Sequence, residues 1–352
     1  MKKLKLLILL LSLTSLGGVA QDNSEFKIYD ETNDSIWLPA KIVISGTFDV
    51  LQNPYWFNQK HFRKKSAELW KRIKTPDQNI KKDGGYSKFF KDEFLSSRVL
   101  PNIGLHFLGG AYDTLWLTEY YTANNYPYPR LWAFLTTYAT HFGNEALETS
   151  GTEISSHDHI ADLYFFDLAA FFFASYENGM NYLINDLGMT AWHFEPMFDL
   201  DGSDFFNTGL NYVFRPKMAY FQEGKFKPLF FLGMQVMGGI SYQVNQKNTF
   251  SFASGMNITD PLKQKGRLVS ALFYETNNQL DASLFINGSE DFRWRLNLYD
   301  NLSKRIRYIP ESWRLHFMLG QKRAAAYMFG INLNMPFGLG GIKNTPREYF
   351  LN

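Results

Sequence analysis

The sequence has 352 residues, with 36 Lys and Arg against 34 Asp and Glu, so its net charge of +2 gives no reason to expect nucleic acid as a partner. It contains no cysteine, which excludes disulfide bonds, thiolate metal sites and a lipid anchor on an N-terminal cysteine. Aromatic residues make up 17% of the chain, although the mean hydropathy is −0.27. This mixture is typical of amphipathic strands, either in an outer-membrane sheet or in a large soluble one.

The first 20 residues have the pattern of a cleavable secretory signal. A basic start with Lys2, Lys3 and Lys5 precedes a short apolar run over residues 6–13. The small residues Gly18 and Ala20 occupy the positions that a signal peptidase reads. Because the apolar run is too short for a membrane span, we expect an exported bacterial envelope protein whose mature part starts at residue 21.

Two segments precede the central part of the chain. Residues 21–56 contain one expected strand, Lys41 to Leu51, which ends at a turn signal formed by Asn53 and Pro54. Residues 57–98 form a basic helical or linker segment with 12 Lys and Arg against 5 Asp and Glu. Such a segment is typical of a solvated helix face, and it would also suit contact with anionic lipid headgroups.

Residues 99–187 are predicted to form a helical domain. The first helix runs from Pro101 to Thr122, the second from Arg130 to about Glu148, and the third starts near His157. Acidic residues interrupt these helices, which argues against membrane spans. The pattern favours a compact helical hairpin or bundle.

Residues 188–341 have the two-residue period of β-strands, and residues 342–352 form a polar C-terminal tail. A lipid-facing barrel has this alternation, and so does a soluble sandwich with one buried face. Export without a lipid anchor, aromatic residues at strand ends and the lack of cysteine favour the barrel. We therefore predict an α+β protein in which an antiparallel, barrel-like sheet of about 8–10 strands carries the helical hairpin or bundle as an insert.

The densest group of polar residues lies in the predicted helical domain. His141, Glu145 and Glu148 share one face of the second helix, while His159 and Asp162 lie at the start of the third. A tight loop would bring the two sets together, and all five residues are candidates for catalysis. Three interpretations stay open: acid–base or hydrolytic catalysis, a metal site, or polar pairs that only lock the hairpin. His141, Glu145 and Asp162 are the candidate ligands for Zn, Mn or Fe, although no motif has strict metal spacing.

Part of the helical domain resembles a known group of proteins. The stretch NIGLHFLGG at residues 102–110, followed by Glu145, Glu148 and Asp162, is similar to the helical core of the uncharacterised Bacteroidota envelope proteins called domain of unknown function 3943. The three acids match acids of that group, but Asn144 stands where the group tends to have Trp. The close match covers about a fifth of the chain. It implies an envelope location and helices followed by strands, and it implies no activity.

These observations lead to one leading prediction and two alternatives. We predict an outer-membrane protein with a structural, transport or lipid-handling role, whose partner is outer-membrane lipid. An envelope enzyme that modifies lipid or glycan with the His/Glu/Asp cluster is one alternative, and a soluble periplasmic binding module is the other. The sequence identifies no cofactor and no protein partner, indicates no nucleic acid, and does not decide whether the protein is an enzyme.

Overall fold

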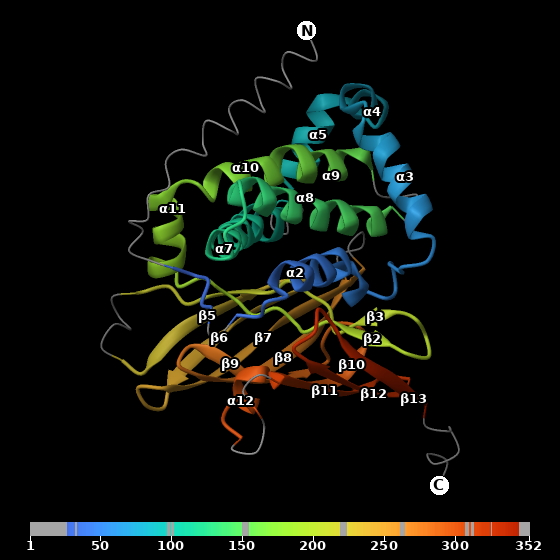
Figure 1. Ribbon diagram of the computed structural model, residues 1–352. Helices are drawn as coiled ribbons and strands as arrows, with labels where there is room; N and C mark the ends of the chain where they lie inside the picture. Colours follow the sequence, from blue (N-terminus) through green and yellow to red (C-terminus); the bar gives the residue numbers. More distant parts are fainter. Residues whose placement is uncertain are drawn as a thin grey trace.

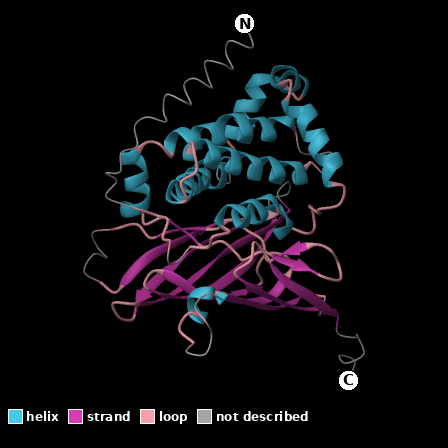
Figure 2. Cartoon of the chain, viewed as in Figure 1, coloured by secondary structure: helices cyan, strands magenta, loops and turns pink. Residues whose placement is uncertain are grey.

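The computed structural model describes residues 27–344, except residues 32–33, 97–98, 100–101, 150–154, 219–223, 261–264, 307–309, 311–312 and 325. The predicted signal and residues 345–352 of the predicted tail lie outside the described residues. The described chain forms two layers, a helical layer that lies against one end of a curled sheet (Figures 1 and 2).

The helical layer contains α-helices, one 3-10 turn (η2) and three π-helical segments (η3, η4 and η5). In chain order these are α2 (Leu38–Thr47), η2 (Asp49–Gln52), α3 (Phe62–Ile73), α4 (Pro76–Lys82), α5 (Gly85–Phe94), η3 (Asn102–Gly109), α7 (Gly110–Ala123), α8 (Pro129–Glu148), α9 (Ser156–Ala161), η4 (Asp162–Phe166), α10 (Asp167–Phe173), α11 (Glu177–Asn181) and η5 (Tyr182–Asp186). The three helices predicted after residue 99 are present. No described helix is long and apolar enough to cross a membrane.

The strand predicted from Lys41 to Leu51 is wrong, because α2 and η2 occupy these residues. The β-branched residues of this stretch favour a strand locally, but tertiary packing overrides that preference. Leu38 and Ile42, four residues apart on α2, are buried in a cluster with Leu117 of α7 and with α8. In the described chain the helical layer therefore precedes the strands, and the prediction that it is an insert between strands is wrong.

In the part of the chain that the structure describes, the sheet has 13 strands, and the short helix α12 (Asp300–Ser303) lies between two of them along the chain. In chain order the strands are β1 (Thr190–Ala191), β2 (Met197–Asp199), β3 (Phe205–Phe206), β4 (Tyr212–Phe214), β5 (Phe226–Leu232), β6 (Gln235–Gln243), β7 (Asn248–Asp260), β8 (Lys265–Thr276), β9 (Gln279–Ile286), β10 (Phe292–Leu298), β11 (Leu315–Lys322), β12 (Ala326–Leu333) and β13 (Gly338–Asn344). All neighbours are antiparallel except β13 and β2, which are parallel. The α+β class and the mostly antiparallel sheet are confirmed.

The predicted barrel and its 8–10 strands are wrong. The strand order is β1-β4-β5-β6-β7-β8-β9-β10-β11-β12-β13-β2-β3, and within the described residues this sheet is not closed into a barrel. Strands β1 to β4 have only two or three residues each, which is too short for an alternating pattern to reveal.

The two ends of the strand order belong to one hairpin. Residues 190–199 contain β1 and β2, and residues 205–214 contain β3 and β4. Between these pairs, Trp192 N–H donates to Asn211 O at 2.8 Å, and Phe194 N–H donates to Gly209 O at 3.1 Å. The sheet therefore curls until a single hairpin borders both of its ends.

The helical layer is held to the sheet by close contacts at the end of the sheet that α2 covers (Figure 1). Ser45 of α2 donates its hydroxyl to Phe194 O at 3.1 Å. Tyr212 of β4 donates its hydroxyl to Asp113 Oδ2 of α7 at 2.9 Å. A Cβ on Gly109 would lie 2.4 Å from the Tyr212 ring, so only glycine allows this approach.

Candidate functional site

Five helical segments bring six titratable side chains together inside the helical layer. These are His106 from η3, His141 and Glu145 from α8, His159 from α9, Asp162 from η4 and Asp167 from α10. The four-residue spacing on α8 directs its two members to one side of the helix. Ser155 caps α9 by accepting a hydrogen bond from His157 N–H at 3.3 Å. The caps and packing thus fix where the members meet.

His106 faces two carboxylates through one ring nitrogen. Its Nε2 lies 3.5 Å from Glu145 Oε1 and 3.8 Å from Asp162 Oδ2. The side chains of Glu145 and Asp162 are almost completely buried, whereas 12% of the His106 side chain is exposed. The three ligand-type atoms lie within 4.8 Å of one another, so they could hold one metal ion.

Asp167 joins the other ring nitrogen of His106 to a second histidine. Its Oδ1 lies 3.0 Å from His106 Nδ1 and 2.6 Å from His141 Nδ1. These are hydrogen-bond distances, and the two histidine rings meet edge to face with centroids 4.6 Å apart. His106, His141 and Asp167 are a second set that satisfies the distance limits for a metal ion.

His159 holds the far side of the Glu145 carboxylate. Its Nδ1 makes a short hydrogen bond to Glu145 Oε2. On the other edge of the ring, Arg72 Nη1 of α3 lies 3.2 Å from His159 Nε2. Since Arg72 can only donate, His159 Nε2 is the acceptor, and Nδ1–H donates to Glu145.

The pKa values of the three carboxyl groups of the cluster shift in different directions. Burial and the negative charges of Asp158 and Asp167 raise the pKa of Glu145 well above its usual value. Burial and the charge of Glu145 do the same to the pKa of Asp162. Burial is the largest influence on Asp167 and opposes its ionisation, but the charges of and hydrogen bonds from His141 and His106 together lower the pKa of Asp167. The lowered pKa of Asp167 and its 2.6 Å contact with His141 favour an ion pair between them, while the raised pKa values of Glu145 and Asp162 disfavour simultaneous ionisation of both.

Four of the five predicted site residues meet in this cluster: His141, Glu145, His159 and Asp162. The fifth, Glu148, is half-buried one turn further along α8, and its charge contributes to the raised pKa of Asp162. Of the three predicted metal ligands, Glu145 and Asp162 lie side by side. His141 instead pairs with Asp167, and His106 takes the position facing the two carboxylates.

Sequence reasoning did not place His106, Asp167 or Arg72 in the site. His106 and Asp167 are 61 residues apart, and Arg72 and His159 are 87 residues apart. No local spacing links such positions. The available signal was the position of His106 before Gly109 and Gly110, where helices can pack closely.

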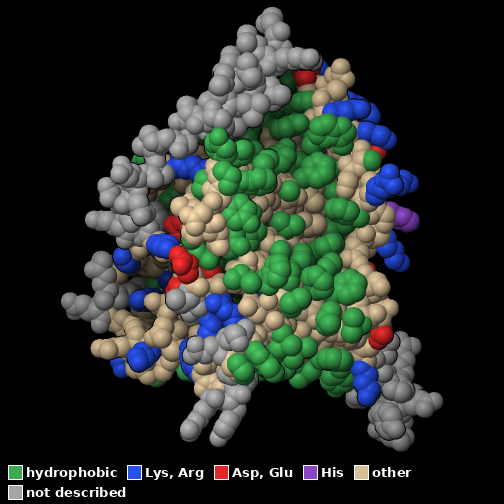
Figure 3. All heavy atoms as spheres, viewed as in Figure 1, with side chains coloured by type: hydrophobic (Ala, Val, Ile, Leu, Met, Phe, Trp, Pro, Cys, Tyr) green, Lys and Arg blue, Asp and Glu red, His purple; other side chains and the backbone are tan. Residues whose placement is uncertain are grey.

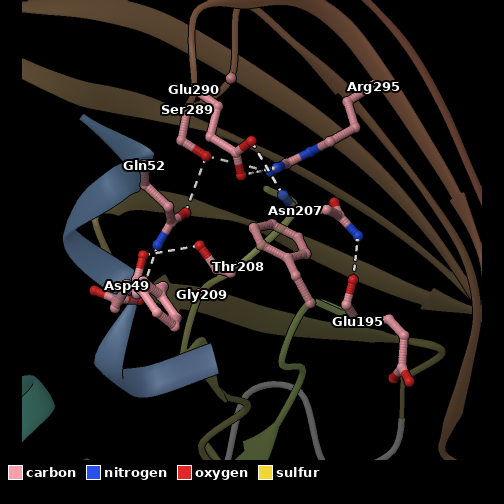
Figure 4. A network of polar contacts seen from close by, with 12 residues as sticks. Asp49, Gln52, Glu195, Asn207, Thr208, Gly209, Ser289, Glu290 and Arg295 are labelled. Atoms are coloured by element: carbon pink, nitrogen blue, oxygen red, sulfur yellow. Dashed lines mark hydrogen bonds and ion pairs between the residues drawn. The ribbon is translucent and has the colours of Figure 1, made fainter. Parts of the chain in front are cut away.

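A second polar network lies between η2 and the inner face of the sheet (Figure 4). Gln52 donates its amide to Asp49 Oδ1 at 2.9 Å and accepts from Ser289 Oγ at 2.9 Å. Arg295 of β10 is buried and donates to Glu290 Oε1 at 3.2 Å and to Ser289 Oγ at 3.3 Å. These bonds tie the helical layer to the sheet, which is a structural role.

Comparison with known proteins adds no assignment. No family model, no curated protein and no solved structure matches the chain. The similarity to the envelope-protein group therefore stays a prediction.

Proposed function

We propose that this protein is an outer-membrane protein of the bacterial envelope, whose curled sheet contacts lipid acyl chains through its outer face. The helical layer would then be held at the membrane by the sheet. One observation carries the proposal: large apolar side chains line the exposed outer face of the sheet, although apolar side chains also fill part of its interior.

Along each long strand, successive side chains point alternately to the outer and the inner face of the sheet. Phe252 of β7 is 48% exposed, Leu268 of β8 is 71% exposed and Phe329 of β12 is 56% exposed. Similar side chains occupy further exposed positions of these and the other long strands, namely Phe230, Val236, Ile240, Phe250, Met256, Leu272, Ile286, Phe317, Leu319, Ile331, Leu333 and Leu339. A contiguous apolar face of this extent marks an interaction surface rather than an ordinary soluble surface.

The inner face has the opposite character over part of its area. Asn257, Ser283, Arg295 and Asn297 are buried there, although an aromatic cluster fills the remainder. A soluble sandwich buries its apolar face and exposes its polar one. Here the apolar side chains lie on the exposed outer face as well as inside, which matches the rule for sheets in lipid and disfavours the soluble binding module.

Two further features suit a membrane. A groove of about 490 Å³ on the sheet is lined mainly by Leu296, Leu298, Phe317, Leu319, Phe329 and Ile331, an apolar wall that an acyl chain could fill. Figure 3 shows hydrophobic side chains over the helical layer and the sheet, with Lys and Arg mainly toward the margins. Arg63, Lys64 and Lys71 on α3 are exposed, which supports contact with anionic headgroups.

Vesicle flotation tests the proposal. Detergent-purified protein is diluted into phosphatidylethanolamine–phosphatidylglycerol vesicles, centrifuged through a density gradient and washed with high salt. We expect the natural sequence to float and to stay bound after the wash, because acyl-chain contact is not screened by salt. The double variant with Phe252→Glu and Leu268→Glu should float several-fold less, since charged side chains on a lipid-facing strand are unfavourable within the membrane.

The matched control adds the same two charges away from the sheet. Thr122→Glu and Asn185→Glu lie at exposed positions of α7 and η5. This double variant should float like the natural sequence. A natural chain that stays monodisperse without detergent and fails to float would contradict the proposal.

A further inference from the structure

We propose that His106 Nε2, Glu145 Oε1 and Asp162 Oδ2 form a binding site for one divalent transition-metal ion. The inference is independent of the membrane proposal, because all three residues lie in the helical layer and none lies on the sheet. It rests on the spacing of the ligand atoms, on the groups that hold them and on carboxylate oxygens left without partners.

The spacing suits ligands of one ion better than hydrogen bonds. His106 Nε2 lies 3.5 Å from Glu145 Oε1 and 3.8 Å from Asp162 Oδ2, both beyond good hydrogen-bond distance. Metal–ligand bonds of about 2.1 Å in a tetrahedral arrangement place ligand atoms about 3.4 Å apart. Small shifts would bring His106 Nε2 to that separation from each carboxylate oxygen, and the two oxygens already lie within 4.8 Å of each other.

This spacing also distinguishes the site from the neighbouring set of His106, His141 and Asp167. In that set Asp167 Oδ1 lies 2.6 Å from His141 Nδ1 and 3.0 Å from His106 Nδ1, so these atoms already form hydrogen bonds. That set is an ion-paired hydrogen-bond network, and we assign it a supporting role.

Outer groups hold two of the three ligands in place. Asp167 accepts from His106 Nδ1, which leaves the lone pair of Nε2 directed at Glu145 and Asp162. A carboxylate behind a ligating histidine is a common partner that sets the tautomer and ring orientation. His159, held by Arg72, binds the second oxygen of Glu145. Asp167 and His159 are therefore positioning residues.

Carboxylate oxygens without partners complete the argument. Asp162 Oδ1, the second oxygen of a proposed ligand, and Asp167 Oδ2, beside the site, are buried and make no hydrogen bond to any other described residue. Buried polar atoms without partners are uncommon, and one explanation is an ion or water that belongs beside them. A cation would also relieve the repulsion between Glu145 and Asp162.

The local backbone and the exposure of His106 fit a binding site. His106 lies in η3 and Asp162 in η4, and both segments are π-helical. Such segments are rare and occur frequently at functional sites. The partial exposure of His106 offers a path for entry of an ion. Three protein ligands leave a coordination position for water, which is typical of catalytic rather than structural zinc sites.

One imidazole with two carboxylates suits Zn²⁺ or Mn²⁺, and metal binding by the full chain tests the site. Detergent-purified protein is stripped with chelator, equilibrated with ZnCl₂ or MnCl₂ and desalted, and bound metal is measured by mass spectrometry. Competition with a chromophoric chelator gives the affinity. We expect about one ion per chain, and at least tenfold weaker binding for Glu145→Gln and for Asp162→Asn.

A matched variant and a second readout separate metal binding from folding. Asp113 is a buried carboxylate of α7 that lies 3.3 Å from His193, so Asp113→Asn alters a histidine–carboxylate pair outside the site. It should bind metal like the natural chain. Asp167→Asn should weaken binding about 10–100-fold yet reach one ion per chain at saturation. Added metal should raise the Tm of the natural chain and not that of Asp162→Asn.

Two results would overturn the site. One is a natural chain that retains neither zinc nor manganese after equilibration. The other is stoichiometric metal whose affinity is unchanged in both Glu145→Gln and Asp162→Asn.

Discussion

Asp49 shows how one buried side chain makes stability depend on pH. Its Oδ1 accepts from Leu210 N–H at 2.8 Å and from the Gln52 amide at 2.9 Å, beneath the helical layer. Burial raises its pKa from 3.8 to about 7, even though both hydrogen bonds lower it. Between these values the folded protein keeps a proton that the unfolded chain has released.

Asp49→Asn should therefore raise the free energy of unfolding more above pH 7 than at pH 4. A carboxyl whose pKa is raised by folding does not lower the free energy of unfolding below about pH 4. The loss of stability grows with pH until the folded group ionises near pH 7. This rise in the pKa of Asp49 corresponds to a loss of at most about 4 kcal/mol in the free energy of unfolding. Asparagine keeps the acceptor oxygen and removes the ionisation.

Urea unfolding in detergent at pH 5 and pH 8 measures this effect. The gain of Asp49→Asn over the natural chain should be larger at pH 8 than at pH 5. Asp201→Asn, at an exposed position, serves as the control. Equal gains at the two pH values would show that Asp49 is ionised in the folded protein.

At the same scale, the sequence predicts one half of the candidate site. The spacing of His141 and Glu145 on a helix identifies them as neighbours, and a short loop brings His159 and Asp162 near. The exchange of His141 for His106 as the neighbour of the carboxylates could not be predicted. It depends on how η3 packs against α10 and η4, which no local pattern records.

Among the elements, α7 depends on a glycine for its place on the sheet. A Cβ on Gly109 would lie 2.4 Å from the ring of Tyr212, which is buried and hydrogen-bonded to Asp113. The ring cannot move aside without losing that bond. Gly109→Ala should lower the free energy of unfolding by about 1–3 kcal/mol, as overpacking typically does.

Gly238→Ala is the matched control, because nothing lies within 4 Å of the Cβ position at this glycine of β6. Thermal or urea unfolding of both variants in detergent provides the comparison. Gly238→Ala should change stability little. A Gly109→Ala variant as stable as the natural chain would mean that α7 and β4 are not packed this closely.

The elements also show why some predictions failed. Long strands such as β7 and β8, with 13 and 12 residues, display the two-residue period clearly. Strands β1 and β3 have two residues each and show no period. The β-branched residues of α2 favour a strand, but the segment is helical because its apolar side chains pack against α7 and α8.

For the whole molecule, composition and alternation predict an α+β protein with a mostly antiparallel sheet. They do not predict that one hairpin, residues 190–214, would provide both ends of the strand order. That arrangement depends on the parallel pairing of Gly338 with Met197, between residues 141 positions apart. Pairing over such distances is set by the curl of the complete sheet.

The central claim is that the outer face of the sheet lies in lipid. Because the chain has no cysteine, single cysteines can be introduced without competing labels. Phe252→Cys, Leu272→Cys and Phe329→Cys place a fluorescent probe on exposed positions of β7, β8 and β12. Lys81→Cys places it on an exposed position of α4 as the control.

The measurement is quenching of each probe by spin-labelled acyl chains in vesicles that contain the protein. Lipid contact predicts strong quenching and a blue-shifted emission at all three strand positions, with little quenching at position 81. Emission typical of water at the three strand positions, without quenching, would contradict a lipid-facing sheet.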